Sequence, residues 1–327
     1  NEVFVFWNDK SILSKASSRF SIDLSKVKYF DNIFLKTNLL TRLLKTKNFD
    51  AIFYLSDGSI PLVSSDLYIH FQFPVEWVNI SGFVDKQKIS RIKKIITNSD
   101  YTKSYIDKKF DVKSLVVYPP TYFEKDLPSV NYKIKENQIL NVGRLSKLPT
   151  GELFKKQDFI INAFKKMVDK GIKDWELVLV VSFLEKDKYL VNKIKELSKG
   201  YPIKIYENET KHKLDDIYKK SKIYWHASGF GEDLEKSPEK AEHFGITTVE
   251  AMANAVVPVV IDAGGQKEIV DSQSGFIFNT EKELIEKTEK IINDTVLIKK
   301  MSEKAQIRAR YFVTDKFCQN LLNIFKK

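Results

Sequence analysis

The sequence has little cysteine, no long apolar run and no glycine near its start. A single cysteine, Cys318, is present among 327 residues, so no disulfide can form within the chain, and a reduced compartment fits this usage. No run of 18 apolar residues is present, which excludes a predicted transmembrane helix. The first glycine is Gly58, which excludes a glycine-rich phosphate loop before that position. The remaining composition, 43% hydrophobic and 13% aromatic, predicts two globular domains of ordinary size.

The charge is positive but is not concentrated in a tail. The formal net charge of +11 divides into +6 for residues 1–138 and +5 for the rest. This even spread argues against a dedicated nucleic-acid-binding arm, whereas it permits attraction to phosphate ligands or to an anionic membrane surface. The stretch 38–47 has a leucine stripe with basic flanks, which is typical of a helix packed on a sheet or of a helix on a membrane surface.

The second half of the chain alternates apolar strand-length runs with amphipathic stretches. This alternation predicts a doubly wound α/β domain with a parallel sheet, whose ligand edge lies at the carboxyl ends of the strands. The expected strands are 139–142, 176–183, 203–206, 223–227, 257–261 and 276–278, and the expected helices are 157–170, 187–199, 212–220, 247–254, 266–271 and 281–295.

The first half alternates less regularly but has the same two kinds of element. The expected strands are 2–6, 27–30, 50–55, 67–71, 95–97 and 115–118, and the expected helices are 38–47 and 86–94. A further helix is expected to begin within 98–103, where Ser99 or Asp100 could cap it. The polar stretch 122–136 is expected to link two domains, and 301–325 is expected to be largely helical.

One stretch, 242–253, reads E-H-F-G-I-T-T-V-E-A-M-A and places Glu242 and Glu250 around a phenylalanine–glycine pair. Thr247 and Glu250 have the spacing of a capping box, so a helix is expected to begin near Thr247. Free amides at this helix start suit an anion such as a diphosphate, and they belong to Gly245, Ile246, Thr247 and Thr248. The alternative is that Glu250 only completes the cap and that Glu242 is a solvated charge.

Other polar residues follow the expected strands. Gly143 and Arg144 follow the first strand of the second half, and Lys155 and Lys156 lie in the next loop. An arginine fork and a lysine point charge that converge suit two phosphate groups, although solvated surface charges have the same pattern. His70 ends an N-terminal strand, where a ligand site and a hydrogen-bonded core histidine are the two interpretations.

Taken together, these motifs resemble those of the retaining glycosyltransferases of family 4. The resemblance rests on the E-x7-E block from Glu242 to Glu250, on V-G-R-L followed by K-x-Q-D-x-x-I-x-A-F, and on Y-I-H-F-x-x-P around His70. The form E-H-F-G-I is most similar to the branch that contains dolichol-linked-oligosaccharide α-1,2-mannosyltransferases and their bacterial and archaeal relatives. The resemblance implies an α/β fold of the GT-B class, in which two Rossmann-like doubly wound domains face each other across a cleft.

The resemblance also implies roles for single residues. Glu242 would hold the donor sugar, Glu250 the nucleotide ribose, and His70 would face the sugar. Arg144 and Lys155 would bind the diphosphate, with Lys156 as the alternative lysine, because Lys-Lys stands where the family has Lys-Gly. The other donor-binding residues that the resemblance implies are Gly143, Phe244, Gly245, Ile246, Thr247, Thr248, Gly264 and Gly265.

The implied function is transfer of a sugar from a nucleotide diphosphate sugar to a hydroxyl of a glycan or lipid-linked glycan, with retention of configuration. No metal and no other cofactor is expected, and GDP-mannose is implied only by the E-H-F-G-I form. The expected location is the cytoplasm, with peripheral association with an anionic inner membrane face as an option, and no nucleic-acid partner is expected. The alternatives are a non-catalytic nucleotide-sugar-binding subunit, a basic nucleic-acid-binding module and a GT-B epimerase.

Three parts are expected along the chain: an acceptor-side domain with its linker at 1–138, a nucleotide-sugar domain at 139–300 and a final helix at 301–327 that crosses back. The first expected strand resembles the second strand of the family. The N-terminal domain is therefore expected to lack its first strand and its glycine-rich loop, either because the sequence is a fragment or because the domain is shortened by nature.

Overall fold

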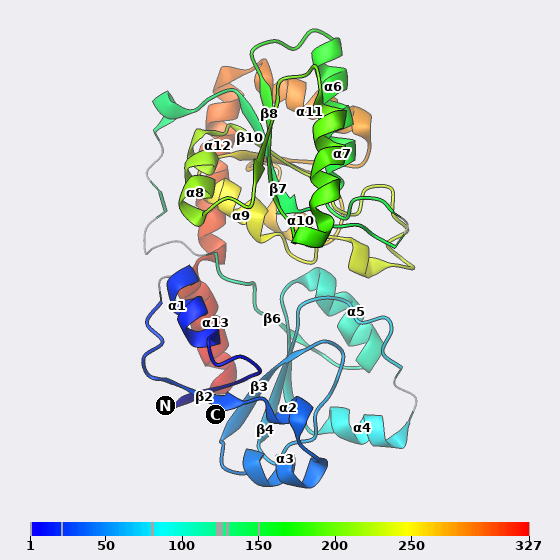
Figure 1. Cartoon of the computed structure of the whole chain (residues 1–327), viewed down its shortest axis with the longest axis vertical. Coiled ribbons are helices and arrows are strands. Elements are labelled where there is room, and N and C mark those ends of the chain that lie inside the picture. Colours follow the sequence, from blue (N-terminus) through cyan, green and yellow to red (C-terminus); the bar gives the residue numbers. More distant parts are fainter. Residues whose placement is uncertain are drawn as a thin grey trace.

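The computed structural model describes residues 2–20, 22–79, 82–121, 127–128, 131–149 and 151–326. These residues form two lobes, the N-terminal one at the bottom of Figure 1 and the C-terminal one at the top. Each lobe has its own parallel sheet and its own cluster of buried apolar side chains.

The C-terminal lobe contains a six-stranded parallel sheet in the order β12-β11-β10-β7-β8-β9. Strands β8 and β9 follow β7 on one side of it, and β10, β11 and β12 follow one another on the other side. Doubly wound sheets bind ligands where the strand order reverses, and here that point lies between β7 and β10. The strands are β7 (Gln138–Arg144), β8 (Glu176–Ser182), β9 (Ile203–Glu207), β10 (Ile223–His226), β11 (Val257–Ile261) and β12 (Phe276–Phe278).

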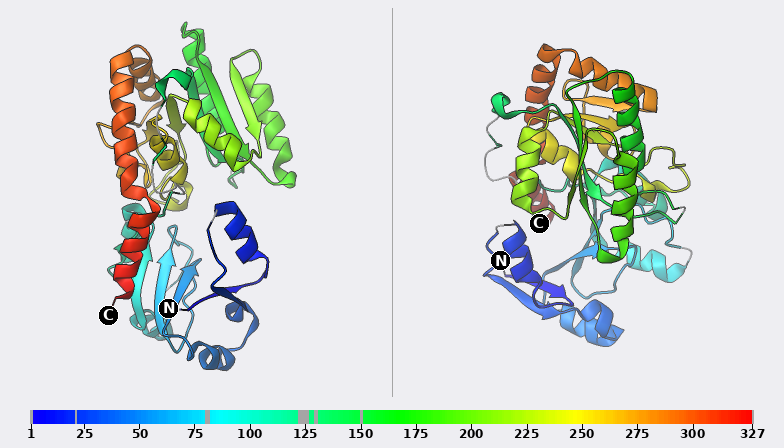
Figure 2. Two further views of the ribbon diagram at one scale, coloured as in Figure 1. Left: turned by 90° about the vertical axis from the view of Figure 1, so that its left-hand side faces the viewer. Right: turned by 45° about the horizontal axis from the view of Figure 1, so that its top comes forward.

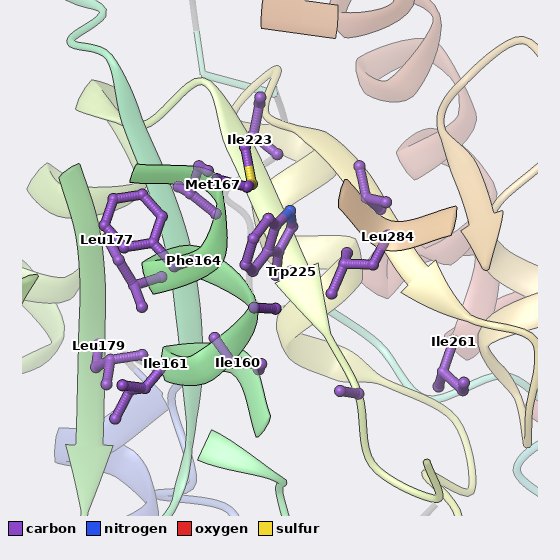
Figure 3. Packing of buried hydrophobic residues seen from close by; sticks show 14 of the residues in the cluster. Ile160, Ile161, Phe164, Met167, Leu177, Leu179, Ile223, Trp225, Ile261 and Leu284 are labelled. Carbon is purple, nitrogen blue, oxygen red and sulfur yellow. The ribbon is translucent and has the colours of Figure 1, made fainter. Parts of the chain in front are cut away.

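Helices cover both faces of this sheet (Figure 1). On one face, Phe164 and Met167 of α6 (Gln157–Asp169) pack against Leu177 of β8 and Trp225 of β10 (Figure 3). The buried indole N–H of Trp225 donates to the hydroxyl of Thr288 at 3.0 Å, so this bulky residue is buried without a polar penalty. The helices are α6 (Gln157–Asp169), α7 (Lys188–Ser198), α8 (Lys211–Lys220), α9 (Ile246–Ala253), α10 (Gln266–Ile269) and α11 (Glu281–Ile292), with short 3-10 turns at Glu185–Asp187 and Pro238–Lys240.

The N-terminal lobe contains a four-stranded parallel sheet, β3-β4-β5-β6, and a separate parallel pair, β1-β2. Ile69 and Phe71 of β4 pack with Ile106 and Phe110 of α5 to form the core of this lobe. The strands are β1 (Val3–Trp7), β2 (Val27–Asp31), β3 (Ala51–Ser56), β4 (Asp66–Phe71), β5 (Ile92–Thr97) and β6 (Leu115–Val116). The helices are α1 (Ile12–Phe20), α2 (Ile33–Lys36), α3 (Leu39–Thr46), α4 (Phe83–Ser90) and α5 (Asp100–Phe110).

Two chain segments cross side by side between the lobes. The hydroxyl and the amide of Thr121 both donate to the carbonyl of Phe312, at 2.8 and 3.0 Å. Beyond this point the last helix lies on the N-terminal sheet, where Phe325 packs on Tyr68 with ring centroids 4.5 Å apart. Figure 2 shows these C-terminal helices, orange to red, along one side of both lobes. They are α12 (Thr295–Ala309) and α13 (Thr314–Phe325), joined by a 3-10 turn at Arg310–Phe312, and a further 3-10 turn spans Tyr132–Ile134.

The predicted elements of the second half are confirmed, and all six strands end within two residues of their expected ends. The helix predicted at 86–94 is confirmed over 86–90 by α4, but its predicted end is wrong, because α4 ends at Ser90 and β5 begins at Ile92. The pattern was misleading because Lys93 and Lys94 lie exposed at the start of this strand. Two helices, α1 and α2, were not predicted at all. The division at 138 and 300 stays a prediction; β7 begins at Gln138, and α12 continues through position 300.

Across the described ranges, none of the helices combines the length and the apolar character that crossing a bilayer requires.

Candidate functional site

The predicted site residues of the C-terminal lobe gather at the switch point of its sheet. Gly143 and Arg144 end β7, and His226 ends the neighbouring strand β10. The stretch with the two glutamates follows β10 and continues into α9, and the turn with Gly264 and Gly265 follows β11. Because the strands are parallel, their carboxyl ends lie along one edge, and loops far apart in the sequence meet there.

A carboxylate between two basic side chains forms the centre of this edge. The Nζ atom of Lys155 lies 2.5 Å from an oxygen of Glu242, and the Nε2 atom of His226 lies 2.9 Å from the same oxygen. Lys155 and Glu242 each keep about a fifth of their side-chain surface exposed. The backbone of Gly143 makes room for the lysine, because a Cβ there would lie 3.1 Å from its Cγ atom. The site therefore has a positive and a negative group in direct contact, both open to a ligand.

The electrostatics of this cluster favour an ionised carboxylate. Burial raises the pKa of Glu242, but the charge of Lys155 and the hydrogen bond from His226 outweigh it and hold the pKa well below its usual range. Burial lowers the pKa of His226, so its ring is neutral at pH 7 and donates from Nε2 to the carboxylate. The other nitrogen, Nδ1, is buried and has no hydrogen-bond partner in the described part of the chain.

Glu250 lies within α9 and not at its cap. The residue is 8% exposed, and its carboxylate accepts a hydrogen bond from the hydroxyl of Tyr218 at 3.0 Å and lies 3.9 Å from the Nζ atom of Lys211. Burial raises the pKa of Glu250, which Lys211 and Tyr218 counteract. The predicted capping box is wrong: α9 begins at Ile246 with Gly245 as the N-cap residue. A buried carboxylate with a single hydroxyl donor has free acceptor capacity, which suits it to bind a diol.

The start of α9 offers fewer free amides than predicted. The amide of Thr248 donates to the carbonyl of Gly245 at 3.0 Å, so it is not free. The hydroxyl of Thr248 is buried and donates to Gln266. Ile246 and Thr247 are the first two residues of the helix, whose amides have no partner within a helix. Of the four amides predicted to bind an anion, those of Gly245, Ile246 and Thr247 remain without a hydrogen-bond partner in the described part of the chain.

Two glycines allow the turn after β11 to contact the Glu242 segment. Gly264 has φ +61°, and a Cβ there would lie 2.1 Å from the carbonyl oxygen of Glu242. Gly245 has φ +118°, and a Cβ there would lie 2.3 Å from the side chain of Gln266. The amide of Gly265 also donates to the carbonyl of Glu242 at 2.8 Å. These contacts fix the backbone on both sides of Glu242.

Arg144 and Lys156, both predicted to meet phosphate, differ in their surroundings. Arg144 is exposed at the end of β7, and no carboxylate pairs with its guanidinium among the residues described here. Lys156 is buried, has φ +54°, and pairs with Glu152 and Glu232 at 2.5 Å each. Lys156 is therefore neutralised by two carboxylates, whereas Lys155 contacts Glu242 at the sheet edge; the assignment of Lys155 to the diphosphate stays a prediction.

Two predicted residues do not join this cluster through their side chains. The ring of Phe244 is buried between Tyr118 and Phe312, so only its backbone is available to a ligand. His70 is buried on the face of β4 that carries Tyr68, and its ring packs on Phe53. Burial lowers the pKa of His70 to about 4. Its role toward a donor sugar stays a prediction.

In the loop that follows β4, the side chain of Phe73 contacts the C-terminal lobe. Its ring lies 6.0 Å from that of His243, and it stacks on Trp77.

Some residues of the site were missed by sequence reasoning. The sequence patterns did not place His226, Tyr218 or Gln266 at the donor site. The spacing between these residues and their partners gives no local signal, since Tyr218 precedes Glu250 by 32 positions. No group of three or more His, Cys, Asp or Glu side chains with metal-binding geometry occurs within the described ranges.

Comparisons with known proteins identify the family of the chain. The family model described as "Glycosyl transferases group 1" matches residues 123–308. A GDP-Man:Man(3)GlcNAc(2)-PP-Dol alpha-1,2-mannosyltransferase of Neurospora crassa is 26% identical over 237 residues, which are 61% of this chain and 39% of that protein. The alpha-1,3/1,6-mannosyltransferase ALG2 of Dictyostelium discoideum is 39% identical over 93 residues, 26% of this chain and 21% of that protein. The matches thus span about two fifths and one fifth of the length of these curated relatives.

Solved structures show the same fold. A glycosyltransferase from Rickettsia africae ESF-5 has a TM-score of 0.73 at 16% identity, with 99% of this chain and 89% of that chain covered. Anabaena Alr3699/HepE in complex with UDP has a TM-score of 0.71 at 16% identity, with 98% and 90% covered. The predicted GT-B architecture of two Rossmann-like domains is confirmed. Because the family model matches more than half of the sequence, the chain belongs to the glycosyl transferases group 1 family.

Proposed function

We propose that this chain transfers a sugar from a nucleotide diphosphate sugar to a hydroxyl of a glycan or lipid-linked glycan, with retention of configuration. The observation that carries the proposal is the contact of Lys155, Glu242 and His226 at the switch point of the C-terminal sheet. A mannosyl donor is supported by the names of both curated relatives, and GDP-mannose by the name of the Neurospora crassa relative alone.

The donor would lie along the carboxyl edge of the C-terminal sheet. Glu250, buried with one hydroxyl donor, would accept hydrogen bonds from the ribose diol. Arg144 and Lys155 would hold the diphosphate, the first as a fork and the second as a point charge. The amides of Ile246 and Thr247 would add two donors at the positive end of a helix.

The same positive groups account for catalysis in physical terms. When the nucleotide leaves, negative charge grows on its β-phosphate, and groups that bind this charge more strongly in the transition state lower the barrier. Lys155 is paired with Glu242 before the donor binds, so the diphosphate would take over part of this contact and leave Glu242 to hold sugar hydroxyls. Two cationic side chains beside the diphosphate would let the reaction run without a metal ion.

Retention is implied by the resemblance to family 4, and this arrangement offers no free carboxylate nucleophile that could produce it through a covalent intermediate. A retaining hydrolase uses two close carboxylates, one of which forms a covalent intermediate. Here Glu242 is held by Lys155 and His226, and Glu250 by Tyr218. We propose a front-face route in which the leaving phosphate takes the acceptor proton, while closure of the two lobes excludes water.

The acceptor side of the proposal includes an anionic membrane surface at the inner membrane face. The exposed leucines of α2 and α3 gather beside lysines at the end of α3, and apolar side chains flanked by lysine are typical of helices that lie on anionic membranes. Together with the lipid-linked glycan named for one relative, this surface supports peripheral association. The surface consists of Leu35, Leu39, Leu40, Leu44, Lys45 and Lys47.

The test is a transfer assay with GDP-mannose and UDP-sugars, a lipid-linked glycan acceptor and EDTA, with the anomeric configuration of the product read by NMR. The expected result is transfer with retention that survives EDTA. Glu242→Gln should lower kcat/KM at least tenfold, since a hydrogen bond to a charged group contributes about 1.5–3 kcal/mol. Glu286→Gln, on the exposed face of α11, is the matched control and should leave kcat/KM unchanged.

Three results would contradict the proposal in different ways. Donor binding without transfer to any acceptor would leave a non-catalytic subunit. Turnover of the donor with no acceptor present would indicate an epimerase. An inverted product would remove the front-face route.

A further inference from the structure

A carboxylate of the C-terminal lobe caps a helix of the N-terminal lobe. Glu268, in α10, accepts hydrogen bonds from the backbone amides of Asp100 and Tyr101, each at 2.7 Å and each with a different carboxylate oxygen. These two residues are the first two of α5, and they lie 168 and 167 positions from Glu268 in the sequence. The two lobes are therefore joined by a bidentate contact away from the crossing segments.

The contact completes the N-terminal cap of α5, which residues of the N-terminal lobe satisfy only in part. The hydroxyl of Ser99 accepts the amide of Thr102 at 3.0 Å, as an ordinary N-cap does. The amides of Asp100 and Tyr101 still lack partners within the helix, and Glu268 supplies both. A carboxylate at the positive end of a helix dipole, with two charge-assisted hydrogen bonds, is a strong and directional interaction.

The backbone that carries this carboxylate is held by an arginine of the C-terminal helices. The guanidinium of Arg308, in α12, donates to the carbonyl of Glu268 at 2.6 Å and to that of Ile269 at 3.1 Å. Glu268 also follows the turn of Gly264 and Gly265, which contacts the backbone of Glu242. The cap on α5 is thus rigidly linked to the predicted donor site.

The same helix also holds the loop that precedes the predicted donor site. The hydroxyl of Tyr101 donates to the carbonyl of Pro238 at 2.8 Å, and that of Tyr105 donates to the carbonyl of Leu234 at 3.1 Å. In this loop, buried Glu232 pairs with Lys156, the neighbour of Lys155 in the chain. Helix α5 therefore contacts the C-terminal lobe both before and after α9.

We propose that Glu268 is a positioning residue, a latch that fixes the N-terminal lobe over the donor site so that an acceptor bound by that lobe meets the donor sugar. The kinetic part of this proposal rests on the proposed function. Glu242, Glu250 and Lys155 belong to the C-terminal lobe and make their own contacts there. Loss of the latch therefore lowers the rate of transfer and leaves nucleotide binding in place.

The test compares Glu268→Ala and Glu268→Gln with Thr280→Ala. Thr280 caps α11 inside the C-terminal lobe by accepting the amide of Glu283 at 3.2 Å, so its loss removes a helix cap without touching the lobe interface. Hydrogen–deuterium exchange of the first turn of α5 reports the latch directly. Nucleotide affinity, by calorimetry, and kcat of sugar transfer report its consequences.

In Glu268→Ala, exchange at Asp100 and Tyr101 should speed up at least tenfold, and kcat should fall at least tenfold while the nucleotide Kd stays within threefold. Glu268→Gln should rescue part of both losses, because its amide oxygen still accepts one of the two hydrogen bonds. Thr280→Ala should change neither the exchange nor kcat.

The proposal is overturned if exchange at Asp100 and Tyr101 is unchanged in Glu268→Ala, or if kcat is unchanged while exchange speeds up. An equal loss of nucleotide affinity and kcat would also overturn it, since Glu268 would then support the donor site and not the lobe orientation. The exchange measurement needs no activity. If the wild type transfers no sugar, the proposed function fails, while exchange in Glu268→Ala still decides whether this carboxylate joins the lobes.

Discussion

Replacement of Gly264 by alanine tests whether the turn after β11 fixes the backbone of Glu242. The added Cβ would lie 2.1 Å from the carbonyl oxygen of Glu242 and 3.1 Å from the Cβ of Ala241. The first contact is with backbone, so no side-chain rotation relieves it. The same carbonyl accepts the amide of Gly265 at 2.8 Å, which prevents an easy shift of the Glu242 segment.

The expected loss of stability has two parts. A non-glycine residue with φ near +60° costs about 1–2 kcal/mol, and overpacking against a fixed neighbour costs about 1–3 kcal/mol more. Gly171→Ala is the matched control: Gly171 has φ +102°, and nothing lies within 4 Å of its Cβ position. Gly171→Ala therefore carries only the backbone cost, and we expect Gly264→Ala to be less stable than it by about 1–3 kcal/mol.

Urea denaturation of the three proteins measures this difference, and nucleotide titration shows whether the displaced Glu242 segment also weakens the site. Equal losses of stability for the two variants would refute the reasoning, because the contact with the Glu242 carbonyl would then have no energetic effect. A Gly264→Ala protein as stable as the wild type and with unchanged nucleotide affinity would also refute the reasoning.

The remaining predictions concern titration and membrane binding. Burial raises the pKa of Glu250 above its usual value near 4.5, so nucleotide affinity should fall on acidification at a higher pH than an ordinary glutamate would give; titration of Glu250→Gln should show weaker binding without that pH dependence. Burial lowers the pKa of Lys135 to about 7 from 10.5, so unfolding takes up a proton between these values and stability should rise with pH there, by up to about 1.4 kcal/mol per unit. Urea denaturation at pH 7 and 9 should show this rise in the wild type and a smaller one in Lys135→Met. Vesicles with anionic lipids should sediment the wild type and release it when Leu40 and Leu44 become serine, whereas equal binding of both proteins would contradict a membrane role for α3.

The sequence predicts the C-terminal lobe well because its strands are buried on both faces. Such strands read as continuous apolar runs, as 177–181 does, and the helices between them have clear amphipathic periods. The N-terminal lobe is predicted less well, because its elements carry polar residues where a core pattern is expected. In β5 two exposed lysines precede the buried end, and α1 is rich in serine and exposes much of its surface.

For the candidate site, too, some residues could be predicted from the sequence and others could not. Residues inside one motif, such as Glu242 and Glu250, were found because their spacing is local. Contacts between distant segments leave no such trace: Lys155 meets Glu242 across 87 positions, and Glu268 meets α5 across 168. The capping box at Thr247 failed because Gly245, with φ +118°, lets the helix begin one residue earlier than the side-chain pattern indicates.

The most direct test of the central claim is a titration of GDP, UDP and ADP in EDTA, followed by thermal denaturation, with wild type and Glu250→Ala. A nucleotide at 100 times its Kd should stabilise the protein by about 2.7 kcal/mol. We predict that one nucleoside diphosphate stabilises the wild type without magnesium, and that the shift disappears in Glu250→Ala. The absence of any shift with folded wild-type protein would contradict the claim that this edge of the C-terminal sheet binds a nucleotide diphosphate sugar.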